Sequence, residues 1–343
     1  MYAGLNGDGD LVYAQNYRKA DGTPIYCPHC GQNLVWKRNR KGRAFFAHTY
    51  PCGQDLSQKH LGESVGHQAS KLFMWSLCKE MGLLSQMEVP VLGGQFIADL
   101  RVNNRLIFEF QYAKIGRKDL LYRQSNYHQA GYQAYWFLSE MVFQDKKLKA
   151  WLKRCLAKQG KTYYWLALDL SHRQVKVLTV PGLIFPRDQA SYLWEISCRN
   201  FISRLKKGKF LADIGKGQPY FLKVKPAGQS IIYQKRFGIR NRALSRLINF
   251  LYHLGLNLDD LPAQIFDQAW IGLVTAEPAW LTLAWLYAYY YKIGDYQSAL
   301  EFFHLLLKKD YLRLEGGGLV IDQDQLIVDY VLAAVDLLKN ILS

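Results

Sequence analysis

The sequence lacks the long apolar runs and the leader pattern that mark membrane and secreted proteins. Its longest apolar stretch, residues 279–291, falls short of the roughly 20 residues that a membrane-spanning helix needs. The first ten residues contain no Lys or Arg and no apolar run, which argues against a signal peptide. We therefore expect a cytoplasmic protein without a membrane span.

Cysteine is scarce as well, with six among 343 residues. Three of them fall within residues 27–52 and the others are scattered, which is not the pattern of a disulfide framework. The spacing indicates one metal cluster plus three ordinary buried thiols at Cys78, Cys155 and Cys198.

Acidic residues are few in the first 250 positions, which carry 39 Lys+Arg against 16 Asp+Glu. Residues 251–343 reverse the balance, with 5 Lys+Arg against 12 Asp+Glu. A basic block of this size predicts a polyanionic partner, and nucleic acid is the first candidate. The alternative is a basic protein without such a partner.

Half of the residues are hydrophobic and 14% are aromatic, so the chain has ample material for folded cores. Patterning predicts a helix, three strands, a helix and a strand in order, joined by turns at Gly93-Gly94 and Asn103-Asn104. The predicted ranges are 61–82, 86–92, 95–102, 105–112, 118–130 and 132–138. A basic helix over 146–158, a strand pair over 163–170 and 174–180, and helices from residue 242 onward, with a hairpin near 290–303, complete the prediction.

The turn-rich residues 1–60 contain a spacing typical of structural zinc. Cys27 and Cys30 lie on one tight turn, and His48 and Cys52 follow at a distance that suits a hairpin. We expect these four residues to bind Zn²⁺, with His60 as the rival to Cys52 for the fourth position. The alternatives are free thiols or a redox dithiol, although the Gly-Gln-Asn turn after Cys30 counts against the latter.

Two acidic residues interrupt otherwise apolar strands. Asp99 stands in Phe-Ile-Ala-Asp-Leu-Arg-Val and Glu109 in Leu-Ile-Phe-Glu-Phe-Gln. Burying such carboxylates without compensation costs several kcal/mol, so a divalent cation between neighbouring strands is the economical interpretation. Hard oxygen ligands favour Mg²⁺ or Mn²⁺, which can activate water for attack on a phosphodiester. The alternative is ion pairing with Arg101 or Arg105.

Neighbouring polar residues extend this set. Gln111 shares a strand face with Glu109, because side chains alternate along a strand. Glu63, His67 and Lys71 recur every four residues on the preceding helix, so Glu63 can supply a third acidic group to the same centre.

The order of these elements and carboxylates resembles the restriction-endonuclease-like PD-(D/E)xK nuclease fold, and residues 1 to about 140 resemble the competence protein CoiA family. The matching segments are Tyr26-Cys27-Pro28-x-Cys30, Phe46-Ala47-His48, Glu63-x3-His67-x3-Lys71, Ala98-Asp99-Leu100 and Phe108-Glu109-Phe110-Gln111. The resemblance implies an α/β protein with a restriction-endonuclease-like mixed-sheet core. An N-terminal zinc-binding module (1–60) would precede that core (61–180), and a basic connecting segment (181–241) would lead to an acidic, all-α C-terminal domain (242–343).

The resemblance also implies action on incoming DNA, single-stranded or branched, in natural transformation and homologous recombination. By position, Asp99 and Glu109 would bind Mg²⁺ or Mn²⁺, Glu63 would complete the acidic set, and Gln111 would stand where related nucleases carry a lysine. Because Gln111 has no charge, two interpretations stay open: a metal-dependent deoxyribonuclease, or a non-catalytic DNA-binding mediator on a nuclease scaffold. A nuclease that acts on RNA is a third. The helical end would bind a recombinase, a helicase or another copy of the chain.

Overall fold

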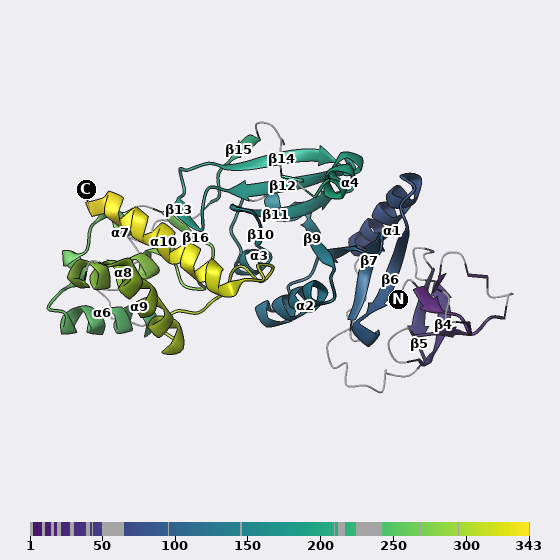
Figure 1. Cartoon of the computed structure of the whole chain (residues 1–343), viewed down its shortest axis with the longest axis horizontal. Coiled ribbons are helices and arrows are strands. Elements are labelled where there is room, and N and C mark those ends of the chain that lie inside the picture. Colours follow the sequence, from purple (N-terminus) through teal and green to yellow (C-terminus); the bar gives the residue numbers. More distant parts are fainter. Residues whose placement is uncertain are drawn as a thin grey trace.

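The computed structural model places the chain in three consecutive parts: a small N-terminal sheet, a large sheet with helices on both faces, and a C-terminal group of helices (Figure 1). The residues that it describes are 3–8, 11–14, 17–18, 22–27, 31–38, 42, 44–49, 65–94, 96–144, 146–208, 210–211, 217–223, 242–267, 269–293 and 295–342.

The N-terminal sheet is antiparallel, with the strand order β2-β1-β3-β4-β5. Its strands are β1 (Ala3–Leu5), β2 (Leu11–Tyr13), β3 (Ile25–Tyr26), β4 (Asn33–Arg38) and β5 (Ala44–His48). Its core is small and centres on Ile25, Leu34 and Phe46. Trp36 closes one side by donating its Nε1–H to the carbonyl of Ala14 at 2.7 Å.

The large sheet has the order β15-β14-β12-β11-β9-β8-β7-β6, and β10 pairs with β11 outside that path. Its members are β6 (Ser85–Val91), β7 (Phe96–Val102), β8 (Leu106–Gln111), β9 (Gln133–Ser139), β10 (Ala157–Gln159), β11 (Thr162–Asp169), β12 (Gln174–Val180), β14 (Ser191–Ser197) and β15 (Gln218–Tyr220). β9 runs parallel to both of its neighbours, β8 and β11, while the other pairs are antiparallel.

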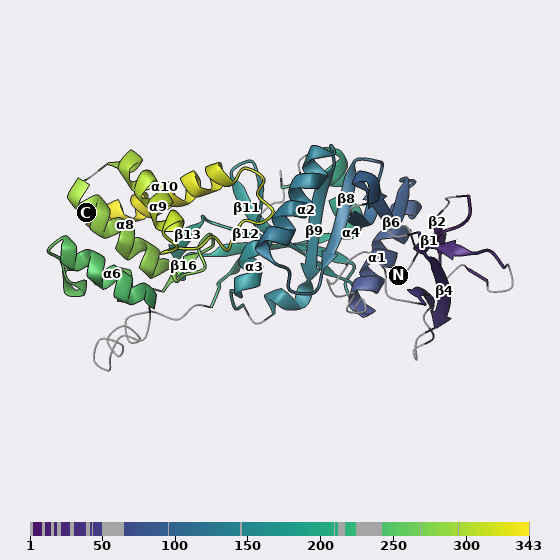
Figure 2. The ribbon, with the colours of Figure 1, turned by 90° about the horizontal axis from the view of Figure 1, so that it is seen from below.

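Helices cover the two faces of this sheet separately. α1 (Val65–Glu80) and α4 (Cys198–Lys206) pack with Phe108 and Phe137 on one face. α2 (Arg117–Gln129) and the short α3 (Ala150–Arg154) lie on the other face, where Ile107 and Trp136 belong to the second core (Figure 2). Burial on both faces explains why β8 and β9 read as nearly continuous apolar runs.

The predicted order of helix, three strands, helix and strand is confirmed by α1, β6, β7, β8, α2 and β9. Asn103 and Asn104 both have positive φ, at 49° and 53°, as the tight turn between β7 and β8 requires. The basic helix predicted over 146–158 is wrong in extent, because only α3 is helical and the chain then turns into β10. Lys146 has a φ of 56°, and Lys147 forms a β-bridge to Lys223, so this stretch cannot begin as a helix.

Residues 184–220 contain β13 (Ile184–Pro186), β14, α4 and β15, and the last two strands extend the large sheet. β13 pairs with β16 (Trp270–Gly272). The expectation of an all-α C-terminal region is therefore wrong. Nothing local in the sequence signals this pairing, which joins two three-residue strands far apart in the chain.

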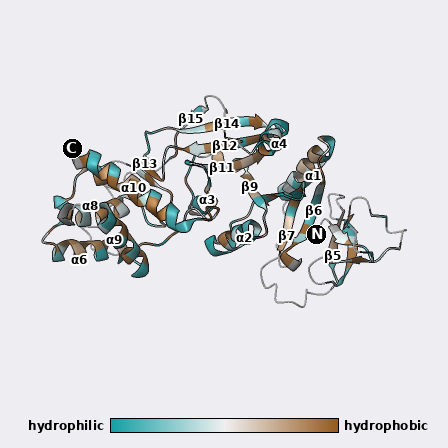
Figure 3. Ribbon diagram, in the orientation of Figure 1, coloured by the Kyte–Doolittle hydropathy of each residue, from teal (hydrophilic) through white to brown (hydrophobic). Residues whose placement is uncertain are grey.

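The rest of the C-terminal region is helical. It contains α6 (Arg242–His253), α7 (Gln264–Asp267), α8 (Ala279–Ile293), α9 (Tyr296–Lys308) and α10 (Gln323–Leu342). The predicted hairpin is confirmed by α8 and α9, where Tyr289 and Phe302 stack with ring centroids 4.1 Å apart. Apolar residues lie along the inner strands and on several of the helices (Figure 3). Among the described residues, no helix combines the length and the apolar character that crossing a membrane requires.

We call the contact between the large sheet and these helices the junction, defined by the ion pairs Arg154–Glu315 and Lys158–Asp329. The C-terminal helices share one hydrophobic core with the α2 face of the sheet. The chain at Gly318 passes so closely that an added Cβ would lie 2.8 Å from the carbonyl oxygen of Arg154. The junction is therefore closely packed.

Candidate functional site

Asp99, in the middle of β7, is surrounded by donors and cations. His67 Nε2 lies 3.0 Å from Asp99 Oδ2, and the backbone N–H of Phe110 donates to the same oxygen at 2.8 Å. Lys71 Nζ is 3.8 Å from the other oxygen, Oδ1. Since His67 and Lys71 are one helical turn apart on α1, the predicted helix face does turn toward the predicted strand carboxylate.

Glu88 on β6 joins this group, although sequence reasoning did not single it out. The pairing of β6 with β7 runs through Met87↔Leu100 and Val89↔Ala98 but skips Glu88 and Asp99. Glu88 has a φ of 53°, a left-handed conformation that is costly for a residue with a side chain. Its Oε1 accepts a hydrogen bond from Lys71 Nζ at 3.0 Å, and both side chains are almost fully buried. A charge within an apolar strand was the signal that could have identified it.

Glu109, on β8, is bound from the opposite face of the sheet by α2. The Nη2 of Arg123 donates to both carboxylate oxygens at 2.9 Å, and the hydroxyl of Tyr127 donates to Oε1. Arg123 also lies over the ring of Trp136, 5.2 Å from its centroid. Arg123 and Tyr127 are four residues apart on α2, so one face of that helix holds the carboxylate.

The two carboxylates differ in their acid strength. Burial opposes ionisation of Asp99, but the hydrogen bond from His67 and the charge of Lys71 outweigh it and hold its pKa below the ordinary range. Burial raises the pKa of Glu109 to about 7, against the attraction of Arg123, and the nearby charge of Asp99 raises it further. Asp99 and Glu109 each lie one residue beyond Leu100↔Phe108, where the antiparallel pairing of β7 and β8 ends.

The ion-pair alternative named Arg101 and Arg105, but neither is the partner found. Arg101 donates to Gln86 on the neighbouring strand. The cations at the carboxylates are instead Lys71 and Arg123, which two helices bring in from opposite faces. Cations therefore do compensate the buried carboxylates, but Lys71 and Arg123 supply the charge rather than Arg101 and Arg105.

Other predicted residues are placed as follows. Gln111 ends β8, and its amide Nε2 donates to the carbonyl of Ala113 at 2.5 Å, so it is engaged with its own chain. Glu63, Cys30, Cys52 and His60 lie outside the described residues. Within the described ranges, no three His, Cys, Asp or Glu side chains gather closely enough to hold a metal ion.

Charge balance shows what this centre could accept. Glu88, Asp99 and Glu109 are three carboxylates, whereas Lys71 and Arg123 are two permanent cations. The Oδ1 of Asp99 has an ammonium at 3.8 Å, beyond hydrogen-bond length, and the Asp99 side chain is 15% exposed. Carboxylate oxygens suit a hard divalent cation, but Glu109 could join Asp99 at such an ion only after releasing Arg123.

In the N-terminal sheet, Cys27 and His48 lie at the same end of β4. The carbonyl of Cys27 accepts the backbone N–H of Gly31, and the N–H of Cys27 donates to the carbonyl of Gln32, so residues 27–32 form a tight turn. On the other side of β4, His48 pairs with Leu34. Cys27 is 3% exposed. The fold thus places one residue of each predicted zinc-binding pair at the same end of β4, on its two sides.

Comparison with known families gives two matching segments, and the boundary between them lies near residue 60. Residues 63–196 match the family "Competence protein CoiA, nuclease-like domain", and residues 1–60 match a domain of unknown function (DUF7828). Among curated proteins and solved structures, nothing matches the chain. The first match runs from α1 into β14 and includes Asp99, Glu109 and both helices that contact them. Residues 63–196 thus form a nuclease-like domain of the competence protein CoiA family.

Proposed function

We propose that this protein is a Mg²⁺- or Mn²⁺-dependent DNA nuclease that acts on incoming single-stranded or branched DNA during natural transformation and homologous recombination. The observation that carries the proposal is the position of Asp99 and Glu109 on the neighbouring strands β7 and β8, in a group with more carboxylates than permanent cations. The succession of α1, the β6–β8 meander, α2 and the parallel β9 further supports a restriction-endonuclease-like core.

In this proposal each residue has a defined task. Asp99 and Glu109 would hold the cation, with Glu63 as a third acidic group. The bound cation would activate a water and stabilise charge on the phosphodiester. His67 orients Asp99 by its hydrogen bond. Lys71 is the positive group beside Asp99, and we assign to it the electrostatic task that the neutral Gln111 cannot perform.

The test is a cleavage assay with the purified full chain and end-labelled single-stranded, duplex and branched DNA, in Mg²⁺ or Mn²⁺. Asp99→Asn and Glu109→Gln preserve shape and remove one charge each, and both should abolish cutting. Glu315→Gln, at the junction, is the matched control because it also removes a carboxylate from an ion pair. Cutting that persists in both site variants would show that another centre, or a contaminant, is responsible.

A second candidate is a DNA-binding mediator without catalysis. Two observations favour it: both oxygens of Glu109 accept bonds from Arg123, and the amide of Gln111 is bound to Ala113. Binding that survives chelation, with no cutting in any metal, would support this function. A matched RNA strand in the same assay distinguishes the ribonuclease alternative.

We also propose a structural Zn²⁺ held by Cys27, Cys30, His48 and Cys52. The burial of Cys27 and the position of Cys27 and His48 at the same end of β4, on its two sides, support it. Metal analysis should find one zinc per chain, lost in Cys27→Ser and kept in Cys78→Ser. If His60→Ala loses zinc and Cys52→Ala keeps it, His60 is the fourth ligand. The cytoplasmic location and a partner for the C-terminal helices stay predictions.

A further inference from the structure

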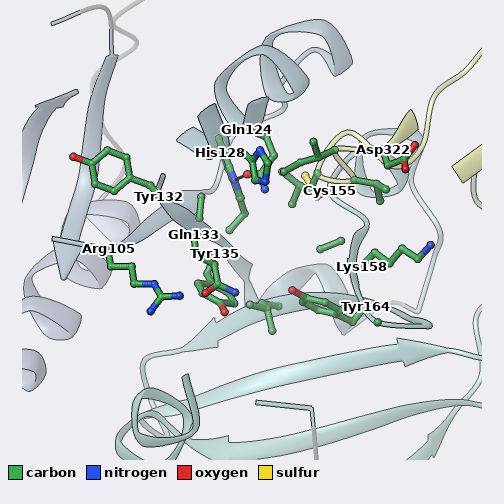
Figure 4. Close-up of a pocket in the computed structure, with 18 of the residues that line it drawn as sticks. Arg105, Gln124, His128, Tyr132, Gln133, Tyr135, Cys155, Lys158, Tyr164 and Asp322 are labelled. Atoms are coloured by element: carbon green, nitrogen blue, oxygen red, sulfur yellow. Dashed lines mark hydrogen bonds between the residues drawn. The ribbon is translucent and has the colours of Figure 1, made fainter. Parts of the chain in front are cut away.

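The large sheet is split at one point, and the split contains a cavity of about 570 Å³. β9 and β11 pair only from Phe137↔Leu166 onward. Before that point the two strands separate, and β11 takes β10 as its neighbour instead. The cavity lies where they diverge, between the end of α2 and the chain at residues 319–322 (Figure 4).

Two tyrosines, one from each diverging strand, line this cavity. Tyr135 and Tyr164 are 5% and 6% exposed, and both rings pack against Phe210. Their hydroxyl groups face the cavity (Figure 4). A phenol hydroxyl can donate one hydrogen bond to an oxygen acceptor. These two hydroxyls can therefore donate to a polar group that enters the cavity.

The remaining polar lining is rich in donors. Arg105 extends its guanidinium toward Tyr135, and His128 and Gln133 lie nearby (Figure 4). Lys158 is held by Asp329 at 2.7 Å, and Asp322 uses one oxygen to accept the N–H of Gln325 at the start of α10. Arg105 is thus the cation best placed to meet an incoming anion.

We propose that this cavity binds one phosphodiester unit of a single nucleic-acid strand. Arginine and tyrosine are frequent donors to backbone phosphates, and such contacts position a strand without reading its sequence. The volume is that of a pocket for one small ligand, roughly 300–1,000 Å³, and excludes a double helix. The inference rests on the proposed function, since it assigns where the nuclease holds its single-stranded substrate.

The cavity is physically connected to the carboxylate centre. Trp136 lines it, pairs with Glu109 across β8 and β9, and stacks against Arg123. Arg105 immediately precedes β8, four residues before Glu109, which is about 13 Å along a strand. Arg105 at the cavity and Glu109 in the carboxylate centre are therefore joined by one β-strand.

The test measures binding of a fluorescein-labelled twelve-residue thymidine oligonucleotide by anisotropy, in EDTA so that no cutting occurs. Arg105→Gln should weaken binding about five- to tenfold and reduce the salt slope by about 1. The double variant Tyr135→Phe/Tyr164→Phe keeps both rings and should weaken binding about fivefold without changing that slope. Lys339→Gln, an exposed cation on α10, is the charge-matched control and should change binding less than about twofold.

Several outcomes would overturn the assignment. The assignment is wrong if Arg105→Gln and Tyr135→Phe/Tyr164→Phe both bind the oligonucleotide as tightly as wild type. It is also wrong if these variants lose affinity for a blunt duplex as much as for the single strand. If thymidine monophosphate competes as tightly as the oligonucleotide, the cavity serves a free nucleotide. Cleavage by Asp99→Asn and wild type decides the proposed function separately, so the two claims can fail independently.

Discussion

The carboxylate centre and the junction are both built from ion pairs, yet they differ in burial and in charge balance. At the junction, Arg154–Glu315 and Lys158–Asp329 pair one to one, with side chains 16–26% exposed. In the centre, three carboxylates share two permanent cations, and the side chains of Lys71 and Glu88 are only 1% and 5% exposed. A pair that merely joins two parts needs no surplus charge. The two regions therefore differ in burial and in the number of carboxylates for each permanent cation.

The largest expected effect separates the two regions by activity. Asp99→Asn should lower the initial rate of DNA cleavage about 10²- to 10³-fold, because the amide can neither attract the cation nor balance Lys71. Glu315→Gln should leave the rate within about twofold of wild type. Initial rates in Mn²⁺, with folding checked by circular dichroism, make the comparison. Equal losses in both variants would remove the distinction between centre and junction.

The second effect concerns stability. Lys71→Met should destabilise the fold by about 3–5 kcal/mol, because Glu88 and Asp99 lose a buried ammonium. Replacing both partners, in Lys71→Met/Glu88→Met, should recover most of that loss, since no charge is then left without its counterpart. Urea unfolding measures each variant. A double variant as unstable as Lys71→Met would mean that the pair itself is not the source of the loss.

The sequence predicted much of the centre because its signals were local. Apolar runs and the turns at Gly93-Gly94 and Asn103-Asn104 defined the meander, and a charge inside an apolar strand identified Asp99 and Glu109. The partners were misidentified because Arg123 comes from a helix that follows the strands. Arg101 and Arg105 were the obvious candidates because they lie close to the carboxylates in the sequence. The cations found at the carboxylates come instead from helices that pack on the sheet, and closeness in sequence does not reveal them.

What the sequence could not show depends on distant contacts. The role of Glu88 requires Lys71 on another element and a left-handed backbone that no residue type signals. The split between β9 and β11 arises because β10 competes for the same strand, and β10 lies in a stretch with helical propensity. Such competition is settled by packing, which overrides local preference.

Lys153 lies at the junction, but unlike Arg154 and Lys158 it is bound by a backbone carbonyl rather than by a carboxylate. This difference can be tested by varying the pH. It donates to the carbonyl of Thr275 at 3.0 Å, and burial lowers its pKa to about 8, against the attraction of Glu315 and Glu277. Between pH 8 and its ordinary value of 10.5, the unfolded chain binds the proton that the folded chain has released, so stability rises with pH.

The matched comparison for this titration is Lys153→Met, which cannot titrate. The free energy of unfolding of wild type relative to Lys153→Met should increase as the pH rises from about 7.5 to about 9.5. Guanidinium unfolding of both proteins at both pH values measures this difference. Arg154, the neighbouring cation, is unchanged in both proteins. A difference that is flat with pH would mean that Lys153 is solvated and that the junction holds no buried charge of this kind.

The smallest expected effect is the coupling between Lys158 and Asp329. Both side chains are about a quarter exposed, and water and salt screen such pairs. A double-mutant cycle with Lys158→Met and Asp329→Asn should give a coupling below about 1 kcal/mol that falls further at high salt. The amide that replaces the Asp329 carboxylate would keep an acceptor for the hydroxyl of Tyr163, so the cycle isolates the charge. The same cycle on Lys71 and Glu88 should give a larger value that salt hardly changes. If the two couplings were equal, burial would not separate the centre from the junction, and only the count of carboxylates would still distinguish them.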